Sequence, residues 1–286
     1  MSGTLAAGGA CRSCLVMTFK ISKLHATGND FLVRLALEGD TRALDVETVA
    51  TMCDRHRGIG ADGLITITAG SGDADCTMTL QNADGGAAEM SGNGIRCLAW
   101  VAARHGFGTD ERLTVDTAAG RRVVTLIRGS EGSVVAADVD MGAVTIDDRD
   151  VRVTVHGTEY RGDVASIGNP HFVCLVDDPG TVRVTTHGPV IERNERFQPQ
   201  RTNVEFIRVD GRDMLTMRVW ERGAGETLSC GTGACAAAAV AKTRDLIDER
   251  VCVRVPGGEL DITVGETVRL GGPVVHIFDM DVEVGS

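Results

Sequence analysis

Lysine is scarce in this sequence. Lys20, Lys23 and Lys242 are the only three lysines in 286 residues, so arginine carries nearly all of the positive charge. A pyridoxal phosphate enzyme needs a lysine that forms a Schiff base with the cofactor. None of the three lysines stands in a sequence context that would cup a phosphate group. The sequence therefore favours an activity that needs no cofactor.

A surplus of positive charge is also missing. The chain has 29 Lys and Arg residues against 40 Asp and Glu residues, which gives a formal net charge of −11. Proteins that bind nucleic acids or anionic membranes use basic residues to neutralise phosphates, so neither partner is expected. Long apolar runs are lacking as well, since none reaches the roughly 18 residues needed to cross a bilayer.

Cysteine is too sparse for a disulfide scaffold. The chain has nine cysteines, an odd number. The Cys-x-x-Cys formed by Cys11 and Cys14 has no second ligand pair to complete a zinc site. We therefore predict no metal site and a reducing, cytoplasmic location.

The start of the chain lacks a positive segment followed by an unbroken apolar core, so it is a poor signal peptide. The sequence from Met17 reads as a natural beginning. We therefore expect residues 1–16 to be a disordered extension.

Strand-like runs outnumber helical ones. Alternating or β-branched segments occur at 31–34, 64–68, 77–81, 121–127, 151–155, 171–176, 203–209, 214–220, 251–255 and 274–278. Helical patterns are fewer, at 46–57, 92–105 and 231–244. The regular alternation of a doubly wound fold is absent. The expected class is therefore α/β of the α+β kind, dominated by strands.

Two short motifs of the first half return in the second half. The Gly-Asn pair at residues 28–29 recurs 140 residues later, at 168–169. The x-Gly-x-Gly turn at 91–94 recurs 139 residues later, at 230–233. Each turn opens a helix of small residues. Two matches at nearly one offset indicate a duplication, so we expect two similar α/β halves that face each other across a cleft.

These turns suit a particular chemistry. A helix start leaves backbone N–H groups unpaired and adds partial positive charge, so it binds a carboxylate readily. It also lowers the pKa of a cysteine placed on it, which favours the reactive thiolate. Two such helix ends facing each other would hold one α-carboxylate and present a reactive side chain to each face of the α-carbon. That arrangement removes a proton from one face and returns it on the other.

Cys230 is the best candidate for the reactive group. A small buried residue at a tight helix start is the alternative explanation. The run Glu221-Arg222-Gly223-Ala224-Gly225-Glu226-Thr227 just upstream places carboxylates and a guanidinium beside the thiol, which favours a site. Cys97 and Cys235 lie inside their helices and are expected to be core residues. His171 is either a satisfied strand histidine or a site residue.

The sequence resembles the diaminopimelate epimerase family over nearly its whole length from Met17. The matching motifs are HATGNDF at 25–31, DRHRGIGADG at 54–63, NADG at 82–85, GNGIRC at 92–97, GNPHF at 168–172, TNVEF at 202–206 and WERGAGETLSCGTGAC at 220–235. The resemblance implies the interconversion of L,L- and meso-diaminopimelate by two thiols without a cofactor. It also implies a homodimer whose chains each have two domains that wrap strands around a central helix.

The resemblance also implies roles for individual residues. The expected catalytic residues are Cys230, Ser91, Glu221 and His171. The expected substrate-binding residues are Asn29, Asn82, Gly92, Asn93, Asn169, Asn203, Arg222, Gly231 and Thr232. The expected domains are the extension at 1–16, a first half at 17–134 with 275–286, and a second half at 135–274, with the active site between the halves.

One position departs from the family pattern. Ser91 stands where the family has its first catalytic cysteine, and a hydroxyl has a much higher pKa than a thiol, whose reference value is about 8.5. Three explanations stay open: an engineered replacement that traps substrate, a natural variant in which Ser91 relays protons, and a chain that kept binding but lost epimerisation. A racemase or epimerase for another amino acid and a non-catalytic diaminopimelate-binding protein therefore remain as alternative functions.

Overall fold

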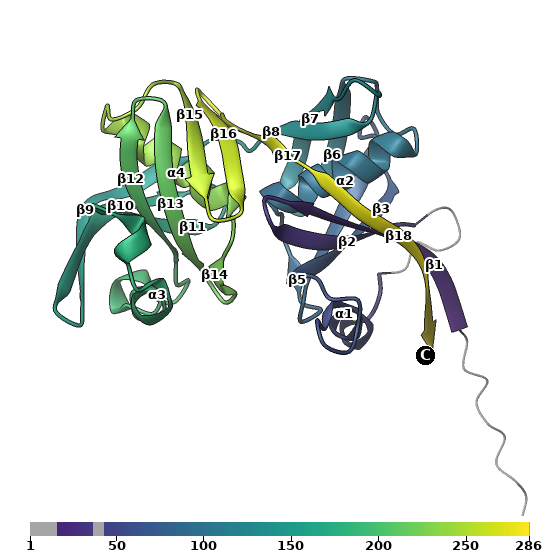
Figure 1. The fold of residues 1–286 in the computed structure, drawn as a ribbon, viewed down its shortest axis with the longest axis horizontal. Coiled ribbons are helices and arrows are strands. Elements are labelled where there is room, and N and C mark those ends of the chain that lie inside the picture. The colour runs from purple at the N-terminus through teal and green to yellow at the C-terminus, as the bar shows by residue number, and fades with distance from the viewer. Residues whose placement is uncertain (1–15, 37–42, 286) are drawn as a thin grey trace, which may run out of the picture.

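The computed structural model describes residues 16–36 and 43–285. The chain forms two lobes that lie side by side (Figure 1). In each lobe strands surround one long helix, which is α2 (Gly92–Arg104) in the first lobe and α4 (Gly231–Thr243) in the second. Apart from Val16, the extension predicted at 1–16 lies outside the described residues.

The elements follow each other in the same order in both lobes. The first lobe contains β1 (Val16–Ala26), β2 (Asn29–Leu35), α1 (Val46–Cys53), β3 (Gly63–Ala69), β4 (Cys76–Asn82), β5 (Ala87–Ala88), α2, β6 (Arg112–Thr117), β7 (Gly120–Arg128), β8 (Val134–Asp140) and, from the end of the chain, β18 (Val275–Gly285). The second lobe contains β9 (Thr145–Val155), β10 (Thr158–Ser166), β11 (Pro170–Leu175), α3 (Val184–Glu192), β12 (Asn203–Gly211), β13 (Met214–Glu221), β14 (Gly225–Thr227), α4, β15 (Arg250–Val255), β16 (Gly258–Val264) and β17 (Val268–Pro273).

The second lobe repeats the strand pairings of the first. β2 pairs in parallel with β3, as β11 does with β12, and β4 pairs in parallel with β6, as β13 does with β15. The other neighbouring strands pair antiparallel in both lobes, and the counterparts β8 and β17 pair with each other where the lobes meet. The predicted fold class and the duplication inferred from the sequence are therefore confirmed.

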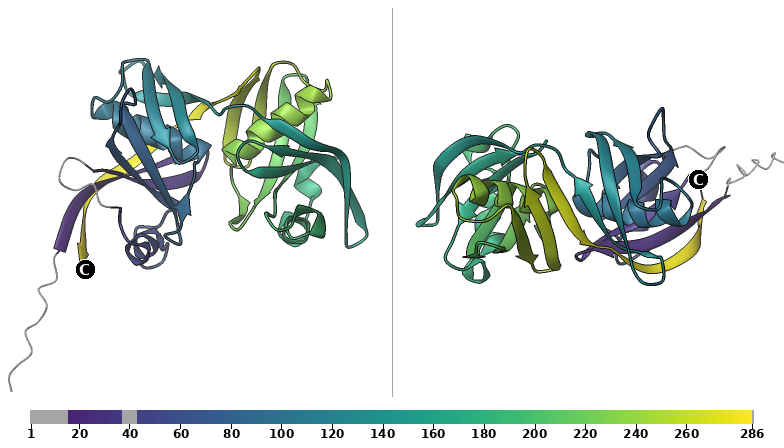
Figure 2. Two further views of the ribbon diagram at one scale, coloured as in Figure 1. Left: turned by 180° about the vertical axis from the view of Figure 1, so that it is seen from behind. Right: turned by 90° about the horizontal axis from the view of Figure 1, so that it is seen from above.

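Each lobe is completed by a strand that follows the last strand of the other lobe. β9 follows β8 and pairs with β10, whereas β18 follows β17 and pairs with β1. Figure 2 shows β18 running back along β1 at the outer side of the first lobe. The predicted domain boundaries fall at the start of β8 and immediately before β18. The exact division into domains stays a prediction, because β8 pairs with β7 on one side and with β17 on the other.

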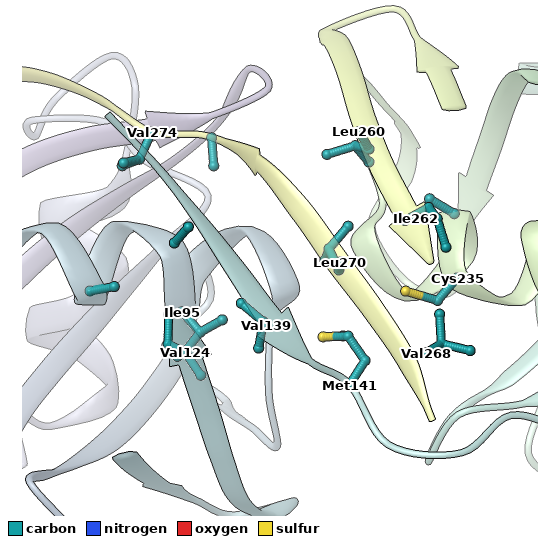
Figure 3. Close-up of a cluster of buried hydrophobic side chains, with 14 of the residues drawn as sticks. Ile95, Val124, Val139, Met141, Cys235, Leu260, Ile262, Val268, Leu270 and Val274 are labelled. Atoms are coloured by element: carbon teal, nitrogen blue, oxygen red, sulfur yellow. The ribbon is translucent and has the colours of Figure 1, made fainter. Parts of the chain in front are cut away.

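The two central helices are buried on nearly all sides. Ten of the 13 residues of α2 and ten of the 13 residues of α4 are buried. This is expected for α4, whose residues are nearly all small or apolar, whereas α2 also buries Asn93 and Arg96. One hydrophobic core runs through both lobes. Figure 3 shows Leu270 of β17 among side chains of both lobes, including Val139 of β8 and Cys235 of α4. Leu270 also packs against the starts of both helices, since a Cβ on Gly92 would lie 2.5 Å and one on Gly231 2.8 Å from its Cδ2.

Two helices differ from the sequence-based expectation. The helix predicted at 46–57 ends at Cys53, because Asp54 is extended and its carboxylate accepts the backbone N–H groups of His56 and Arg57. Helix α3 was not predicted, since it contains Gly188 and Pro189, which disfavour helix interiors. A Cβ at Gly188 would lie 2.5 Å from the Trp220 side chain, so packing requires glycine there. None of the helices in the described ranges is long and apolar enough to cross a membrane.

Candidate active site

The two central helices start next to each other. A Cβ built on Gly231 would lie 3.3 Å from the Cα of Gly92. Ser91 is the N-cap of α2 and its Oγ accepts the Gly94 N–H at 3.0 Å. Cys230 is the N-cap of α4 and its Sγ accepts the Gly233 N–H at 3.4 Å. The predicted pair therefore occupies equivalent positions on two adjacent helix starts.

A cavity of about 740 Å³ opens at these helix starts and is lined by residues of both lobes. Eight predicted site residues line it, namely Asn29, Asn82, Ser91, Asn93, Glu221, Arg222, Cys230 and Gly231. The other predicted residues, Gly92, Asn169, His171, Asn203 and Thr232, are not part of the lining. The structure thus brings the predicted residues into one region, with some of them on the wall and others behind it.

Cys230 is almost completely enclosed, with 4% of its surface exposed. Burial raises the pKa of its thiol well above the usual value, and the carboxylates of Glu221 and Glu205 raise it further. Hydrogen bonds from Thr232 and from the Gly233 N–H act in the opposite direction. The low thiol pKa expected from the helix start is therefore wrong, because burial beside two acidic residues outweighs the backbone donor.

Glu221 ends β13 beside Cys230. Burial raises the pKa of its carboxyl, while hydrogen bonds from the Thr227 hydroxyl and the Cys230 thiol lower it. Asn82 ends β4, the counterpart of β13 in the first lobe, and lines the same cavity. The equivalent ends of β13 and β4 therefore contribute a carboxyl group from the second lobe and an amide group from the first lobe.

His171 lies behind the cavity wall and is fully buried. Its Nδ1 lies 2.7 Å from Oε1 of Glu205, and its Nε2 lies 3.0 Å from Oδ1 of Asn169. The Nδ2 of Asn169 donates to the Thr232 hydroxyl at 3.4 Å. Glu205 was not predicted, although the TNVEF motif contains it. The feature that could have indicated it is a carboxylate between the apolar residues Val204 and Phe206 of a predicted strand.

Asn203 supports the loop that carries Arg222. Its Oδ1 accepts the backbone N–H of Arg222 at 2.9 Å, and its Nδ2 donates to the Pro170 carbonyl at 2.9 Å. The Arg222 guanidinium donates to the Gln200 carbonyl at 2.8 Å and lines the cavity. Asn203 therefore orients the Arg222 backbone from behind the wall, and Arg222 itself faces the cavity.

Asn93 connects the two lobes at the cavity. Its Nδ2 donates to Oδ1 of Asn29 and to the Ser229 carbonyl, each at 3.1 Å. Its Oδ1 accepts a hydrogen bond from Arg96, which is fully buried and whose pKa burial lowers to about 10. Arg96 was not predicted, because its position along α2 gives no sign that its side chain points to the other lobe. A Cβ at Gly272 of β17 would collide with the guanidinium.

Arg55 and Asp62 also line the cavity and were not predicted. Arg55 Nη2 donates to Asp30 at 2.6 Å and to Asp62 at 2.7 Å, and Asp62 also accepts from Asn29 Nδ2 at 2.6 Å. The charged residues of the Gly-rich segment at 54–63 are the feature of the sequence that could have indicated both residues. Within the described parts of the chain, no group of three or more His, Cys, Asp and Glu side chains has the arrangement of a metal site.

The fold is shared with solved structures that include epimerases. The crystal structure of a hydroxyproline epimerase from Agrobacterium vitis superposes with a TM-score of 0.75 at 16% identity, covering 94% of this chain and 93% of that one. A family model described as diaminopimelate epimerase matches residues 21–146 and 164–276.

Relatives with curated names agree. A diaminopimelate epimerase of Synechococcus elongatus is 40% identical over 286 residues, covering 94% of this chain and 100% of that protein. One of Moorella thermoacetica is 41% identical over 278 residues, covering 91% of this chain and 97% of that protein. The chain belongs to the diaminopimelate epimerase family and is an isomerase. The resemblance drawn from the sequence motifs is thereby confirmed.

Proposed function

We propose that this chain converts L,L-diaminopimelate into meso-diaminopimelate by moving a proton from one face of the α-carbon to the other. One observation supports this most directly: Ser91 and Cys230 cap two adjacent helix starts and line the same cavity. A substrate held between the helix starts meets one capping side chain on each face. Diaminopimelate is the substrate in the names of the relatives that match at about 40% identity.

The helix starts supply the binding site for the α-carboxylate in this proposal. Unpaired backbone N–H groups and the helix dipoles at Gly92–Asn93 and Gly231–Thr232 attract an anion. Binding there lowers the energy of the carbanion as well, because its negative charge spreads onto the carboxylate oxygens. Arg222, together with Asn29 and Asn82, which line the same cavity, binds the distal end of the substrate.

The proton transfer uses the two capping residues. In one direction the Cys230 thiolate takes the α-proton, so that the C–H electron pair remains on carbon, and the Ser91 hydroxyl donates a proton to the opposite face. The serine oxygen then recovers a proton from solvent and the Cys230 thiol releases the proton that it took, which restores the starting state. In the other direction the Cys230 thiol is the donor. Because its pKa is raised, the thiol is mostly protonated at neutral pH, which suits the donor role.

The test is turnover in deuterated water with no added cofactor. We expect L,L-diaminopimelate to invert at one α-carbon and to acquire deuterium there, as followed by proton NMR and chiral chromatography. The matched control is Cys230→Ser, which keeps a capping oxygen on α4 and should abolish both signals. If the unsubstituted chain shows no inversion and no exchange, the proposal is contradicted. Tight calorimetric binding without exchange would identify a diaminopimelate-binding protein instead.

We also propose that two copies of the chain associate through the exposed face of β18. Val275, Ile277, Phe278 and Met280 on this strand are 45%, 49%, 38% and 37% exposed, which is unusual for a row of apolar side chains. Sedimentation should give the mass of a dimer, and Ile277→Asp should give a monomer. The cytoplasmic location is likewise a proposal, and fractionation of the source cells tests it.

A further inference from the structure

A buried carboxyl group close to Cys230 has no place in the proton transfer described above. Glu205 of β12 is fully buried, and its Oε2 has no hydrogen-bond partner within the described residues. Its Oε1 contacts His171 at 2.7 Å. A Cβ at Gly233 would lie 2.7 Å from the same oxygen, so the carboxyl group lies directly against the first turn of α4. Burying such a group is costly, which calls for a functional explanation.

A continuous chain of polar contacts leads from Glu205 to the reactive sulfur. It runs from Glu205 Oε1 to His171 Nδ1 at 2.7 Å and from His171 Nε2 to Asn169 Oδ1 at 3.0 Å. It continues from Asn169 Nδ2 to Thr232 Oγ1 at 3.4 Å and from Thr232 Oγ1 to Cys230 Sγ at 3.5 Å. The four contacts connect β12, β11 and the first turn of α4.

The orientation of the Asn169 amide fixes the direction of the two bonds that it makes in this chain. An amide oxygen only accepts, so His171 Nε2 must carry a proton and donate to Asn169. The Asn169 amide nitrogen then donates to Thr232 Oγ1. Thr232 Oγ1 accepts that bond and keeps its own proton, so either atom of its contact with Cys230 Sγ can be the donor.

Glu205 is the group that sets this direction. With Nε2 protonated, His171 Nδ1 either accepts a hydrogen bond from a neutral Glu205 or, when it too is protonated, donates a hydrogen bond to an ionised Glu205. Both arrangements are neutral overall and both keep Nε2 protonated. Without a partner at Nδ1, the other tautomer becomes available, Asn169 is free to turn over, and Thr232 then donates to Asn169 and no longer to the sulfur.

We propose that Glu205 is a positioning residue that orients the chain His171–Asn169–Thr232 so that the Thr232 hydroxyl donates a hydrogen bond to Cys230 Sγ. This donor stabilises the thiolate form at a place where the thiolate is otherwise disfavoured. The titratable groups that face Cys230 are Glu221 from β13, Glu205 from β12 and, through the chain, His171 from β11. The proposal rests on the proposed function only in taking Cys230 as the reacting thiol.

The experiment measures the reactivity of the Cys230 thiol, which does not depend on turnover. Iodoacetamide labelling of the full chain is followed across pH by mass spectrometry of the peptide that contains Cys230. Glu205→Gln and Glu205→Leu both remove the carboxylate that raises the Cys230 pKa, but Glu205→Gln keeps a donor for His171 Nδ1, so it serves as the reference. Glu205→Leu also removes the partner of His171 Nδ1, so labelling at pH 8 should be about tenfold slower than in Glu205→Gln, as expected when one hydrogen bond to a charged group is lost. Cys252, which is partly exposed, reports any loosening of the fold in the same samples.

A second pair of variants tests the other end of the chain. Thr232→Ser keeps the hydroxyl and should label like the unsubstituted chain, whereas Thr232→Val should label about tenfold more slowly. The double variant with Glu205→Leu and Thr232→Val should be no slower than Thr232→Val alone, because both changes remove the same hydrogen bond. Independent, multiplicative effects would overturn the proposal. If Glu205→Leu does not fold, the Thr232 pair still decides whether the hydroxyl acts on the sulfur.

Nitrogen NMR of His171 supplies a direct measurement. We expect a protonated Nε2 in the unsubstituted chain and in Glu205→Gln, and a population with unprotonated Nε2 in Glu205→Leu. An unprotonated Nε2 in the unsubstituted chain would overturn the proposal. These readouts also separate it from the proposed function, because a chain without epimerase activity can still show the predicted labelling pattern, and an active epimerase can fail to show it.

Discussion

The first residues of the two central helices, Gly92 and Gly231, pack against each other, and a Cβ on Gly231 would lie 3.3 Å from the Cα of Gly92. Neither position has room for a larger residue. The contact brings together two helix starts that each expose unpaired N–H groups. It also places the capping residues Ser91 and Cys230 on the wall of one cavity. The close approach of two glycines is therefore what creates a site with two faces.

Adding a methyl group at this contact should cost both stability and activity. A Cβ at Gly92 would lie 2.5 Å from Cδ2 of Leu270, so Gly92→Ala should lower the free energy of unfolding by about 1–3 kcal/mol, the usual cost of overpacking. Turnover should fall as the helix starts separate. Urea unfolding and the epimerase assay measure the two effects.

A shortened neighbour provides the control for this change. Leu270→Val removes the methyl group that the new Cβ would meet, so Gly92→Ala should cost less in that background than in the unsubstituted chain. Costs that simply add would show that Leu270 is not the source of the strain.

Ser91→Cys should raise the rate of inversion at least tenfold. The thiol gives up and takes a proton near neutral pH far more readily than a hydroxyl, and it replaces the weaker of the two capping groups. The rate is followed by proton NMR with L,L-diaminopimelate. Ser133→Cys adds a thiol at an exposed position and should leave the rate unchanged. An unchanged rate in Ser91→Cys would show that position 91 does not take part in proton transfer.

The rate of deuterium exchange that depends on Cys230 should rise with pH. Burial and the neighbouring carboxylates raise the pKa of the thiol, so only a small fraction is ionised at neutral pH. At pH values below that pKa, each rise of one pH unit should increase the thiolate fraction, and hence the exchange rate, about tenfold. Exchange rates measured from pH 6 to pH 9 test this. A plateau that begins below pH 7 would contradict a raised pKa.

Asp30→Asn should destabilise the first lobe in a pH-dependent way. Burial opposes ionisation of Asp30, but hydrogen bonds from Arg55 and Lys23 lower its pKa from 3.8 to about 2. The substitution leaves the buried Lys23 without its carboxylate and should cost roughly 3–5 kcal/mol at pH 7. Because the pKa is lower in the folded state, this contribution is present above pH 4 and is lost as the pH falls toward 2.

Urea unfolding at pH 7 and at pH 3 measures this cost, which should be smaller at pH 3. Asp116→Asn is the control, since Asp116 pairs with Arg121 in solvent and should matter little at either pH. An equal cost of Asp30→Asn at both pH values would mean that packing, and not the ion pair, is responsible.

Arg222→Lys should weaken binding of diaminopimelate about tenfold, because the planar guanidinium binds a carboxylate with two parallel hydrogen bonds and an ammonium does not. Calorimetry in a Cys230→Ser background gives the affinity without turnover. Lysine, which lacks the distal carboxylate, should bind equally weakly with and without the change. The same loss for both ligands would show that Arg222 acts on the loop and not on the distal carboxylate.

The sequence by itself determined the duplication, the strand-rich class and the two helix starts. These features depend on local patterns, such as the x-Gly-x-Gly turns at 91–94 and 230–233, whose backbone needs are met within a few residues. It also identified Cys97 and Cys235 as core residues, and both are fully buried. The seven motifs were sufficient to predict the family.

Only the tertiary structure decided how the site works. The pKa of the Cys230 thiol is raised because the residue is buried and because Glu221 and Glu205, from two different strands, lie beside it, and no local pattern reports such burial and proximity. In the same way, Arg96 reaches Gly272 in the other lobe. Electrostatic energies depend on burial and on distances between atoms. Residues that are far apart in the chain therefore determine the chemistry of Cys230, whereas the sequence identified only its position.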